Sequence, residues 1–219
     1  MSRTDRALAE ACHALVQFLV REGAIRNPAV ADAFRQTPRH RFVPADLLAE
    51  AYANRALPVD CGQTISQPWM VAVMTELLAP EPDHTILEIG TGTGYQAAIL
   101  ARLCRRVVTV ERIPELSEQA ACRFRQLGLT NIVCRVGDGT LGWPVDGPYD
   151  GIVVTAGAPG IPAALSAQLR DGGVMAIPVG DRFCQTLLAV RRAGDAFVTD
   201  AHGDCVFVRL IGRDGWAAE

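Results

Sequence analysis

Residues 86–95 read ILEIGTGTGY, an apolar run that passes through three closely spaced glycines and ends at a tyrosine. The apolar run predicts a buried strand, and the glycines predict a tight turn into a following helix. Amide groups at the start of such a helix are free to bind a ligand. The stretch therefore predicts a ligand site at the carboxyl end of a strand.

Predicted strands and helices alternate outward from this stretch. The predicted strands are Thr85–Ile89, Val107–Val110, Ile132–Val136, Gly151–Thr155 and Val174–Val179. The helices predicted between them are Tyr95–Leu103, Pro114–Leu127 and Pro162–Leu169. Strands that alternate with helices of this length indicate a doubly wound α/β fold with a mostly parallel sheet.

The two ends of the chain differ from this centre. On the amino-terminal side, helices are predicted at Asp5–Glu22, Pro28–Gln36 (capped by Asn27) and Pro68–Leu78, with an irregular stretch over residues 37–68. On the carboxyl-terminal side, Thr186–Arg191, Ala196–Thr199 and Cys205–Ile211 are predicted strands without a crossover helix, so we expect them to pair antiparallel at the sheet edge. We expect one domain over residues 1–219, divided into a helical and substrate-binding part (1–80), an α/β core (81–180) and a strand region (181–219).

Composition excludes several classes of protein. The 219 residues carry a net charge of −3, which argues against nucleic acid as a partner. No apolar run reaches the ~18 residues of a membrane span or forms a secretory signal, so we expect a cytoplasmic protein. All 21 basic residues are arginine, which excludes lysine chemistry. The seven cysteines and four histidines are scattered and predict neither a disulfide framework nor a metal site.

An acidic residue accompanies the glycine-rich turn. Glu111 follows Gly90 by 21 residues, at the end of the next predicted strand, where a carboxylate accepts hydrogen bonds from ribose hydroxyls. A dinucleotide fingerprint would have glycine at position 95, but Tyr95 stands there. This spacing favours S-adenosylmethionine over NAD as the cofactor.

Two further carboxylates each have two interpretations. Glu88, just before the glycines, either holds the amino group of the ligand or satisfies amides of the turn. Asp138, in the run Gly137-Asp138-Gly139, either accepts from an adenine amine or forms an Asp-Gly turn. Sequence alone leaves both pairs open.

Several motifs resemble one family, the protein-L-isoaspartate O-methyltransferases. The similar runs are RFVP (41–44), GQTISQP (62–68), LEIGTGTGY (87–95), VER (110–112), GDG (137–139), GWP (142–144) and PVG (178–180). GQTISQP is the most specific of them, and the resemblance extends from about residue 20 to the end of the chain. It implies a Rossmann-like fold and methyl transfer from S-adenosylmethionine to the free carboxylate of isoaspartyl residues, with repair through a succinimide.

The resemblance also assigns residues. It makes Ser66 the active-site serine, although by residue type alone Ser66 is typical of a helix cap, and the two roles are compatible. The cofactor residues it implies are Glu88, Gly90, Thr91, Gly92, Thr93, Gly94, Glu111, Arg112, Asp138 and Gly139. The substrate residues it implies are Gln63, Thr64, Ile65, Val206 and Arg209. The expected partners are isoaspartyl-containing proteins or peptides, and the sequence does not give an oligomeric state.

Some positions depart from the family pattern. Asn54 stands where aspartate is common, Asp60-Cys61 occupies a stretch that is usually rich in glycine, and Arg209 replaces a usual proline. Arg209 either faces an acidic substrate or is a solvated charge that protects a sheet edge. The departures keep open a relative that methylates normal aspartate in a dedicated peptide to form an aspartimide. A non-catalytic S-adenosylmethionine-binding module and an NAD-dependent oxidoreductase are the remaining alternatives.

Overall fold

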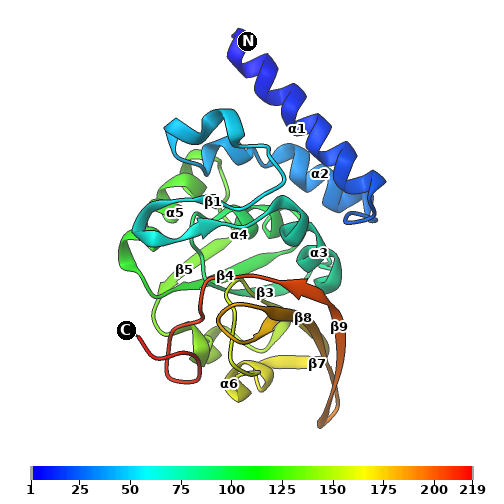
Figure 1. The fold of residues 1–219 in the computed structure, drawn as a ribbon. Coiled ribbons are helices and arrows are strands. Elements are labelled where there is room, and N and C mark those ends of the chain that lie inside the picture. The colour runs from blue at the N-terminus through cyan, green and yellow to red at the C-terminus, as the bar shows by residue number, and fades with distance from the viewer. Residues whose placement is uncertain (1, 219) are drawn as a thin grey trace.

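The computed structural model describes residues 2–218 and centres on a seven-stranded sheet (Figure 1). The strand order is β5-β4-β3-β6-β7-β8-β9. Strands β5 to β7 are parallel, and β8 and β9 add antiparallel at one edge. The strands are β3 (Thr85–Ile89), β4 (Arg106–Glu111), β5 (Ile132–Val136), β6 (Tyr149–Val154), β7 (Leu169–Gly180), β8 (Gln185–Ala193) and β9 (Ala196–Cys205). The predicted doubly wound, mostly parallel sheet with an antiparallel edge is confirmed.

Helices and short turns complete the chain. The α-helices are α1 (Arg3–Arg21), α2 (Pro28–Gln36), α3 (Pro68–Leu78), α4 (Tyr95–Leu100), α5 (Pro114–Gln126) and α6 (Ala163–Ser166). The 3-10 helices are η1 (Arg39–Arg41), η2 (Ala45–Glu50), η3 (Asp60–Gly62), η4 (Gly139–Leu141) and η5 (Pro144–Asp146). A small antiparallel pair, β1 (Leu57–Pro58) and β2 (Thr64–Ile65), lies in the stretch predicted to be irregular. The Asn27 side chain accepts from the Ala29 N–H at 2.9 Å, so the predicted cap of α2 is confirmed.

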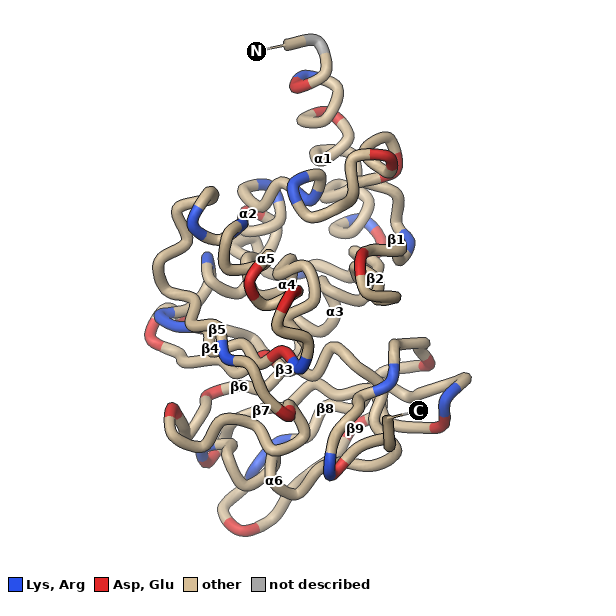
Figure 2. Tube along the Cα trace, turned by 90° about the vertical axis from the view of Figure 1, so that its left-hand side faces the viewer, with Lys and Arg blue, Asp and Glu red and all other residues tan. Residues whose placement is uncertain are grey.

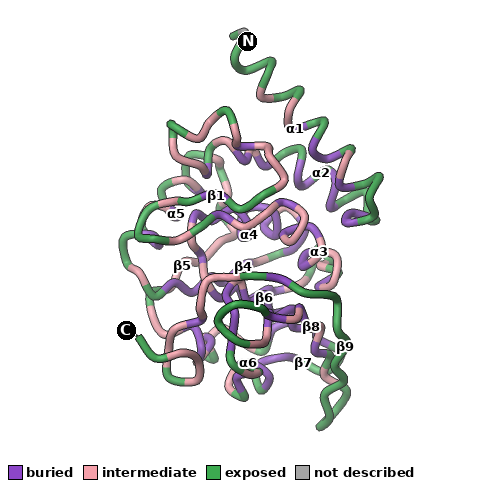
Figure 3. The backbone as a smooth tube through the Cα atoms, in the orientation of Figure 1, coloured by how far each residue is buried: buried purple, intermediate pink, exposed green. Residues whose placement is uncertain are grey.

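The sheet separates two apolar layers, because successive side chains of a strand point to opposite faces. Ile86 and Val107 share one layer with residues of α1 to α5. Leu87 and Ile89 share the other layer with residues of α6, β7 and β8. The centre of the sheet is buried, whereas the amino-terminal half of α1 and nearly all of β9 are exposed (Figure 3).

Two predicted helices are shorter in the structure. Helix α4 ends at Leu100 rather than at residue 103. The side-chain amide of Asn131, the residue just before β5, donates to the carbonyl oxygens of Ala101 at 2.8 Å and Cys104 at 3.1 Å. These carbonyls are therefore satisfied by a side chain instead of by further helical turns. Helix α6 has only four residues, because β7 begins at Leu169, earlier than predicted.

The prediction of an antiparallel sheet strand at Cys205–Ile211 is wrong. Strand β9 ends at Cys205, and the chain then crosses the carboxyl edge of the sheet. There Arg209 forms an isolated parallel bridge with Gly157. The alternating residues of Val206–Leu210 are typical of a strand, but their backbone partners follow β6 instead of lying in a neighbouring antiparallel strand.

Charged residues of both signs are interspersed along the trace (Figure 2). Within residues 2–218, none of the helices combines the length and apolar character that crossing a membrane requires.

Candidate active site

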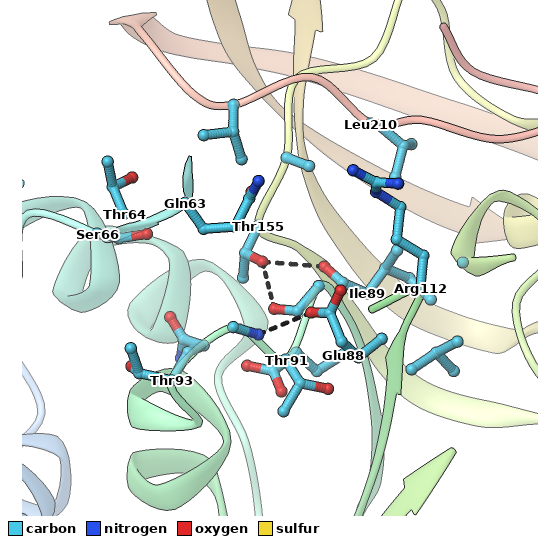
Figure 4. A pocket seen from close by; sticks show the side chains of 18 of the residues that line it. Gln63, Thr64, Ser66, Glu88, Ile89, Thr91, Thr93, Arg112, Thr155 and Leu210 are labelled. Carbon is cyan, nitrogen blue, oxygen red and sulfur yellow. Dashed lines mark hydrogen bonds between the residues drawn. The ribbon is translucent and has the colours of Figure 1, made fainter. Parts of the chain in front are cut away.

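A pocket opens at the carboxyl ends of β3, β4 and β6 (Figure 4). Strand β3 lies between β4 and β6, and the chain winds outward from it in both directions. Such a switch point leaves a crevice at the edge of a parallel sheet. The pocket contains about 780 Å³ of empty space, including its open mouth. Its walls include the first four residues (90–93) of the glycine loop (residues 90–94), residues 63–66 and residues 208–211.

The glycine loop follows β3 with positive φ angles of 92° at Gly90, 51° at Gly92 and 89° at Gly94. Side chains rarely adopt this region, and glycine does so without strain. At Gly90 a Cβ atom would also lie 2.5 Å from Thr155 Oγ1. The Thr155 hydroxyl points to the carbonyl oxygens of Gly90 at 2.6 Å and Ile89 at 3.0 Å. Thr155, just beyond β6, therefore fixes the loop at the floor of the pocket.

Tyr95 begins α4 and is fully enclosed by aromatic and cationic neighbours. Its ring lies edge-on to Phe34 and Phe42, with centroids 6.2 Å and 5.4 Å away, and the Arg39 guanidinium lies 5.0 Å from the ring centroid. Burial raises the pKa of the Tyr95 hydroxyl, so this group stays neutral. A tyrosine at this position is thus held by the helices that precede the sheet, and the helix start lacks the third glycine of a dinucleotide fingerprint.

Glu111 ends β4 and faces the glycine loop. One carboxylate oxygen accepts from the Gly92 N–H at 2.9 Å, and the other accepts from the Ile113 N–H at 3.1 Å. The residue is 6% exposed and lines the pocket. Since a carboxylate has about four acceptor sites, Glu111 can still accept hydroxyl donors from a ligand.

Glu88 is fully buried at the floor of the pocket. Its Oε2 accepts from the Thr109 hydroxyl, and the Thr109 oxygen lies 2.6 Å from the Thr91 hydroxyl, so three side chains form a chain of hydrogen bonds. Within the described residues, Oε1 has no hydrogen-bond partner. Loss of solvent raises the pKa of Glu88 to about 8, against the lowering effect of Thr109.

Ser66 lies in the wall opposite Arg112 and Leu210 (Figure 4). The structure assigns the N-cap of α3 to Gln67, so the interpretation of Ser66 as the cap residue is wrong. The cap bond comes from a distant residue: Asn54 Oδ1 accepts from the Trp69 N–H at 3.0 Å, and the Asn54 carbonyl accepts from the Gln67 amide at 3.0 Å. Asn54 thus holds the start of α3 beside the pocket.

The C-terminal segment (residues 206–216) forms the opposite wall and is anchored at Gly157. The Gly157 N–H donates to Val208 at 2.7 Å, and the Gly157 carbonyl accepts from the Leu210 N–H at 2.9 Å and from the Trp216 indole N–H at 3.0 Å. The buried Gln185 side chain accepts from the Phe207 N–H at 2.8 Å. These contacts place Val208, Arg209, Leu210 and Ile211 in the pocket wall.

Most predicted site residues meet in this one pocket. They are Gln63, Thr64, Ile65, Ser66, Glu88, Gly90, Thr91, Gly92, Thr93, Glu111, Arg112, Gly139 and Arg209. Other pocket residues were not predicted, namely Val71, Ile89, Tyr95, Gln96, Val110, Thr155, Ala156, Val208, Leu210 and Ile211. Thr155 stands at the end of a predicted strand, so the rule that ligands bind at carboxyl strand ends points to it. Nothing in the local pattern singles out Gln96.

Three predicted residues do not line the pocket, and their binding roles stay predictions. Gly94 starts α4, and a Cβ there would lie 2.6 Å from the Phe124 ring. Val206 is 75% exposed at the beginning of the C-terminal segment.

The third is Asp138, whose carboxylate is already engaged by backbone. Its Oδ1 accepts from the Thr140 N–H at 2.9 Å, and its Oδ2 accepts from the Arg213 N–H at 2.8 Å. Partial burial raises the pKa of Asp138, but these hydrogen bonds outweigh it and hold the pKa below its ordinary value. The geometry matches the Asp-Gly turn and also ties η4 to the C-terminal segment.

Comparison with known proteins agrees with this arrangement. A protein from Methanopyrus kandleri named protein-L-isoaspartate O-methyltransferase is 48% identical over 99% of this chain and 98% of its own length. One of the same name from Shewanella halifaxensis is 53% identical over 87% of this chain and 90% of its own length.

Solved structures show the same fold. A protein-L-isoaspartate O-methyltransferase superimposes with a TM-score of 0.85 at 28% identity, over 93% of this chain and 67% of that one. A Plasmodium falciparum structure, described as a protein-L-isoaspartate O-methyltransferase in complex with S-adenosyl-L-homocysteine, has a TM-score of 0.79 at 22% identity, over 90% of this chain and 97% of that one. The family profile described as protein-L-isoaspartate(D-aspartate) O-methyltransferase matches residues 10–215. The chain therefore belongs to the protein-L-isoaspartate(D-aspartate) O-methyltransferase family.

Proposed function

We propose that the protein transfers a methyl group from S-adenosylmethionine to the free carboxylate of L-isoaspartyl residues in damaged proteins. Membership of the family supports this function. The observation that carries it is the pocket itself, in which the Ser66 stretch lies against the glycine loop and Glu111. The seven cysteines are free thiols, which supports the predicted cytoplasmic location.

The residues present fit S-adenosylmethionine. Glu111 has acceptor sites left for the two ribose hydroxyls, and the glycine loop brings backbone close to the ligand. Glu88 and Gln96, which line the pocket, each also have a buried side-chain oxygen without a hydrogen-bond partner in the described chain, and such acceptors suit a pyrophosphate poorly. We assign Thr91, Thr93, Arg112 and Gly139 to the walls around the nucleoside.

The bound methyl donor supplies an electrophilic methyl group on a sulfonium. The acceptor carboxylate is already ionised at neutral pH, since its pKa is near 4, so the enzyme needs no strong general base. The Ser66 hydroxyl donates a hydrogen bond to one carboxylate oxygen and turns the other toward the methyl group. Proximity and alignment then lower the barrier. The backbone amide nitrogen of the following residue then attacks the carbonyl carbon of the methyl ester and expels methanol, which closes the succinimide.

We assign peptide binding to the wall that contains Ser66 and to the wall opposite it. We propose that Gln63, Thr64 and Ile65 contact one side of the substrate, while Arg209 and Val206 contact the other. Arg209 adds a positive charge to a pocket wall that receives an anion. An extended peptide is able to pair with backbone in both places.

A second candidate substrate is a normal aspartyl residue in a dedicated peptide. The presence of Arg209 in the pocket wall, where the family pattern has proline, is the observation that favours it. The two activities form different methyl esters, on the α-carboxylate of isoaspartate or on the β-carboxylate of aspartate, and both esters close to the same succinimide.

Paired peptides separate the two. Each pair has one sequence, once with L-isoaspartate and once with normal aspartate, and methyl transfer is measured as kcat/KM. We expect at least a hundredfold preference for the isoaspartyl form. Preference for the normal form would replace repair by the second candidate, and transfer to neither form would refute the proposed activity.

A further inference from the structure

Arg39, in the 3-10 helix η1, is completely buried. Its side chain has no exposed surface, and burial lowers the pKa of its guanidinium. Its Nη1 has no hydrogen-bond partner in the part of the chain that the structure describes. Burying an incompletely paired charge is costly, and an apolar side chain would fill the space without that cost. The contacts that the guanidinium does make therefore indicate what this residue contributes.

Two of these contacts hold a loop that we name the capping loop (residues 51–55). Arg39 Nε donates to the Ala51 carbonyl at 2.8 Å, and Nη2 donates to the Arg55 carbonyl at 3.4 Å. The planar guanidinium fixes the directions of its donors, so it sets the two ends of the loop relative to each other. Asn54 lies between these ends.

The capping loop in turn holds the stretch that contains Ser66. The Asn54 side chain accepts from the Trp69 N–H at 3.0 Å, and the Asn54 carbonyl accepts from the Gln67 amide at 3.0 Å. Ser66 directly precedes these residues and lines the pocket. A displacement of the capping loop would therefore move Ser66.

The guanidinium also contacts the start of α4. Its Cζ lies 5.0 Å from the centroid of the Tyr95 ring, within the range of a cation–π contact. Tyr95 directly follows the glycine loop and lines the pocket. The glycine loop has its own hydrogen bonds to Thr155 and Glu111. Arg39 therefore connects the Ser66 side of the pocket to the glycine-loop side, while the glycine loop is fixed without it.

We infer that Arg39 is a positioning residue for methyl transfer, which holds Ser66 at a set place relative to the glycine loop. The inference rests on the proposed function, in which Ser66 orients the substrate carboxylate. Arg39 itself does not line the pocket, so it acts through the capping loop. A misplacement of about 1 Å can cost about a hundredfold in rate, so this role predicts a loss in kcat without a loss of methyl-donor binding.

Arg39→Met tests the inference, because methionine is unbranched and apolar and has no donor. The active enzyme is counted by its S-adenosylhomocysteine binding sites in calorimetry. We expect kcat for an isoaspartyl peptide to fall about tenfold or more, and S-adenosylhomocysteine affinity to change less than about twofold. Arg39→Lys restores the charge and one donor group, so its kcat should lie between those of Arg39→Met and the wild type. If Arg39→Met does not fold, Arg39→Lys carries the test.

A mutant cycle with Ser66→Ala separates positioning from a general loss of structure. In the Ser66→Ala background, the Arg39 variant should lower kcat less than about twofold, because the hydroxyl to be positioned is absent. A general loss of structure lowers kcat by the same factor in both backgrounds. Arg41→Met is the matched control: it changes an exposed arginine of the same 3-10 helix and should alter neither kcat nor affinity.

Hydrogen exchange gives a readout that does not depend on activity. The Trp69 N–H donates to Asn54, and the Gly92 N–H donates to Glu111. In the Arg39 variant, exchange should become about tenfold faster or more at Trp69 and keep the wild-type rate at Gly92, because local opening raises the exchange rate only where contacts are lost.

The outcomes are distinct. Unchanged kcat in the Arg39 variant, an equal loss in both backgrounds, or unchanged exchange at Trp69 would overturn the role of Arg39. A loss of kcat that depends on Ser66, together with faster exchange at Trp69 alone, supports it. If the wild-type protein methylates neither isoaspartyl nor aspartyl peptides, the proposed function fails, and exchange at Trp69 still decides whether Arg39 holds the Ser66 stretch.

Discussion

The structure distinguishes between the two roles that the sequence suggests for Ser66, helix cap and active-site serine. Because Gln67 is the N-cap of α3 and Asn54 supplies the side-chain acceptor, the Ser66 hydroxyl is not needed for the helix start. Its position in the pocket wall leaves substrate orientation as the proposed role.

We expect Ser66→Ala to keep the wild-type melting temperature and S-adenosylhomocysteine affinity. Methyl transfer to an isoaspartyl peptide should fall about 10- to 100-fold, because a hydrogen bond to a carboxylate contributes about 1.5–3 kcal/mol. Ser66→Asp should reduce transfer further, since it places a second negative charge beside the substrate. Thermal melting, calorimetry and steady-state kinetics on both variants check this, and full transfer by the alanine variant would exclude Ser66 from substrate binding.

Glu88 makes the stability of the ligand-free protein depend on pH. Burial raises its pKa from the ordinary value of 4.5 to about 8 in the folded state. Between these pH values the folded protein binds more protons than the unfolded chain, so stability falls as pH rises from about 4.5 to about 8. Below this window the stabilising contribution of protonated Glu88 is fully present.

Glu88→Gln should remove this dependence. Urea unfolding of both proteins without ligand at pH 5, 6.5 and 8 measures it as the difference in free energy of unfolding. The free energy of unfolding of the variant should rise relative to that of the wild type at each increase in pH. Parallel curves for the two proteins would show that Glu88 titrates at the same pH in the folded and unfolded states.

At the scale of elements, α3 depends on a residue outside itself. Asn54 accepts the Trp69 N–H from a loop fifteen residues earlier in the chain. Asn54→Ala should therefore cost about 1 kcal/mol of stability, the usual effect of a lost cap. Asn54→Asp should retain the stability, because its carboxylate accepts the same hydrogen bond and favours a helix N-terminus. Chemical unfolding of the two variants is the test, and equal losses would mean that the contact is not a cap.

The same element marks the limit of prediction from sequence. The pattern Gln67-Pro68 predicts where α3 begins, since proline is favoured in a first helical turn, and the structure confirms Pro68. It does not reveal which side chain caps the helix, because Asn54 reaches it only through tertiary folding. Periodicity likewise predicts β3 and β4 but not that α4 ends at Leu100, where Asn131 takes over the carbonyls.

The part of the site that the sequence predicts consists of residues at the carboxyl ends of predicted strands. The glycine loop and Glu111 were predictable because parallel strands end at one edge of the sheet. The C-terminal segment was predicted as a sheet strand, because alternation in Val206–Leu210 does not show which backbone it pairs with. Gln96 was not predicted for a similar reason: its side-chain amide donates to Thr75, which belongs to another helix.

At the scale of the whole molecule, Gly157 joins the sheet to the C-terminal segment. A Cβ atom there would lie 2.8 Å from the Gln185 side chain, which itself holds Phe207. We expect Gly157→Ala to destabilise the protein by about 1–3 kcal/mol and to weaken S-adenosylhomocysteine binding, because Arg209 and Leu210 would leave the pocket wall.

Gly160→Ala is the matched control. No atom lies within 4 Å of a Cβ at this position, and its φ is not in the left-handed region. Thermal melting, calorimetry and the rate of limited proteolysis in the C-terminal segment compare the two variants. Wild-type proteolysis and affinity in Gly157→Ala would show that the segment is held without this anchor.

The walls contributed by residues 63–66 and 208–211 also set the sequence of events in a catalytic cycle. Glu88 is buried at the floor of the pocket, while Ser66 and Arg209 belong to these two walls, which we have assigned to the peptide. If a peptide held between these walls closes the mouth of the pocket, methylated product departs before S-adenosylhomocysteine. When opening of the walls is slower than methyl transfer, the first turnover is fast and later turnovers wait for exchange at the floor. The rate of turnover would then be limited by exchange of the methyl donor rather than by encounter with damaged proteins.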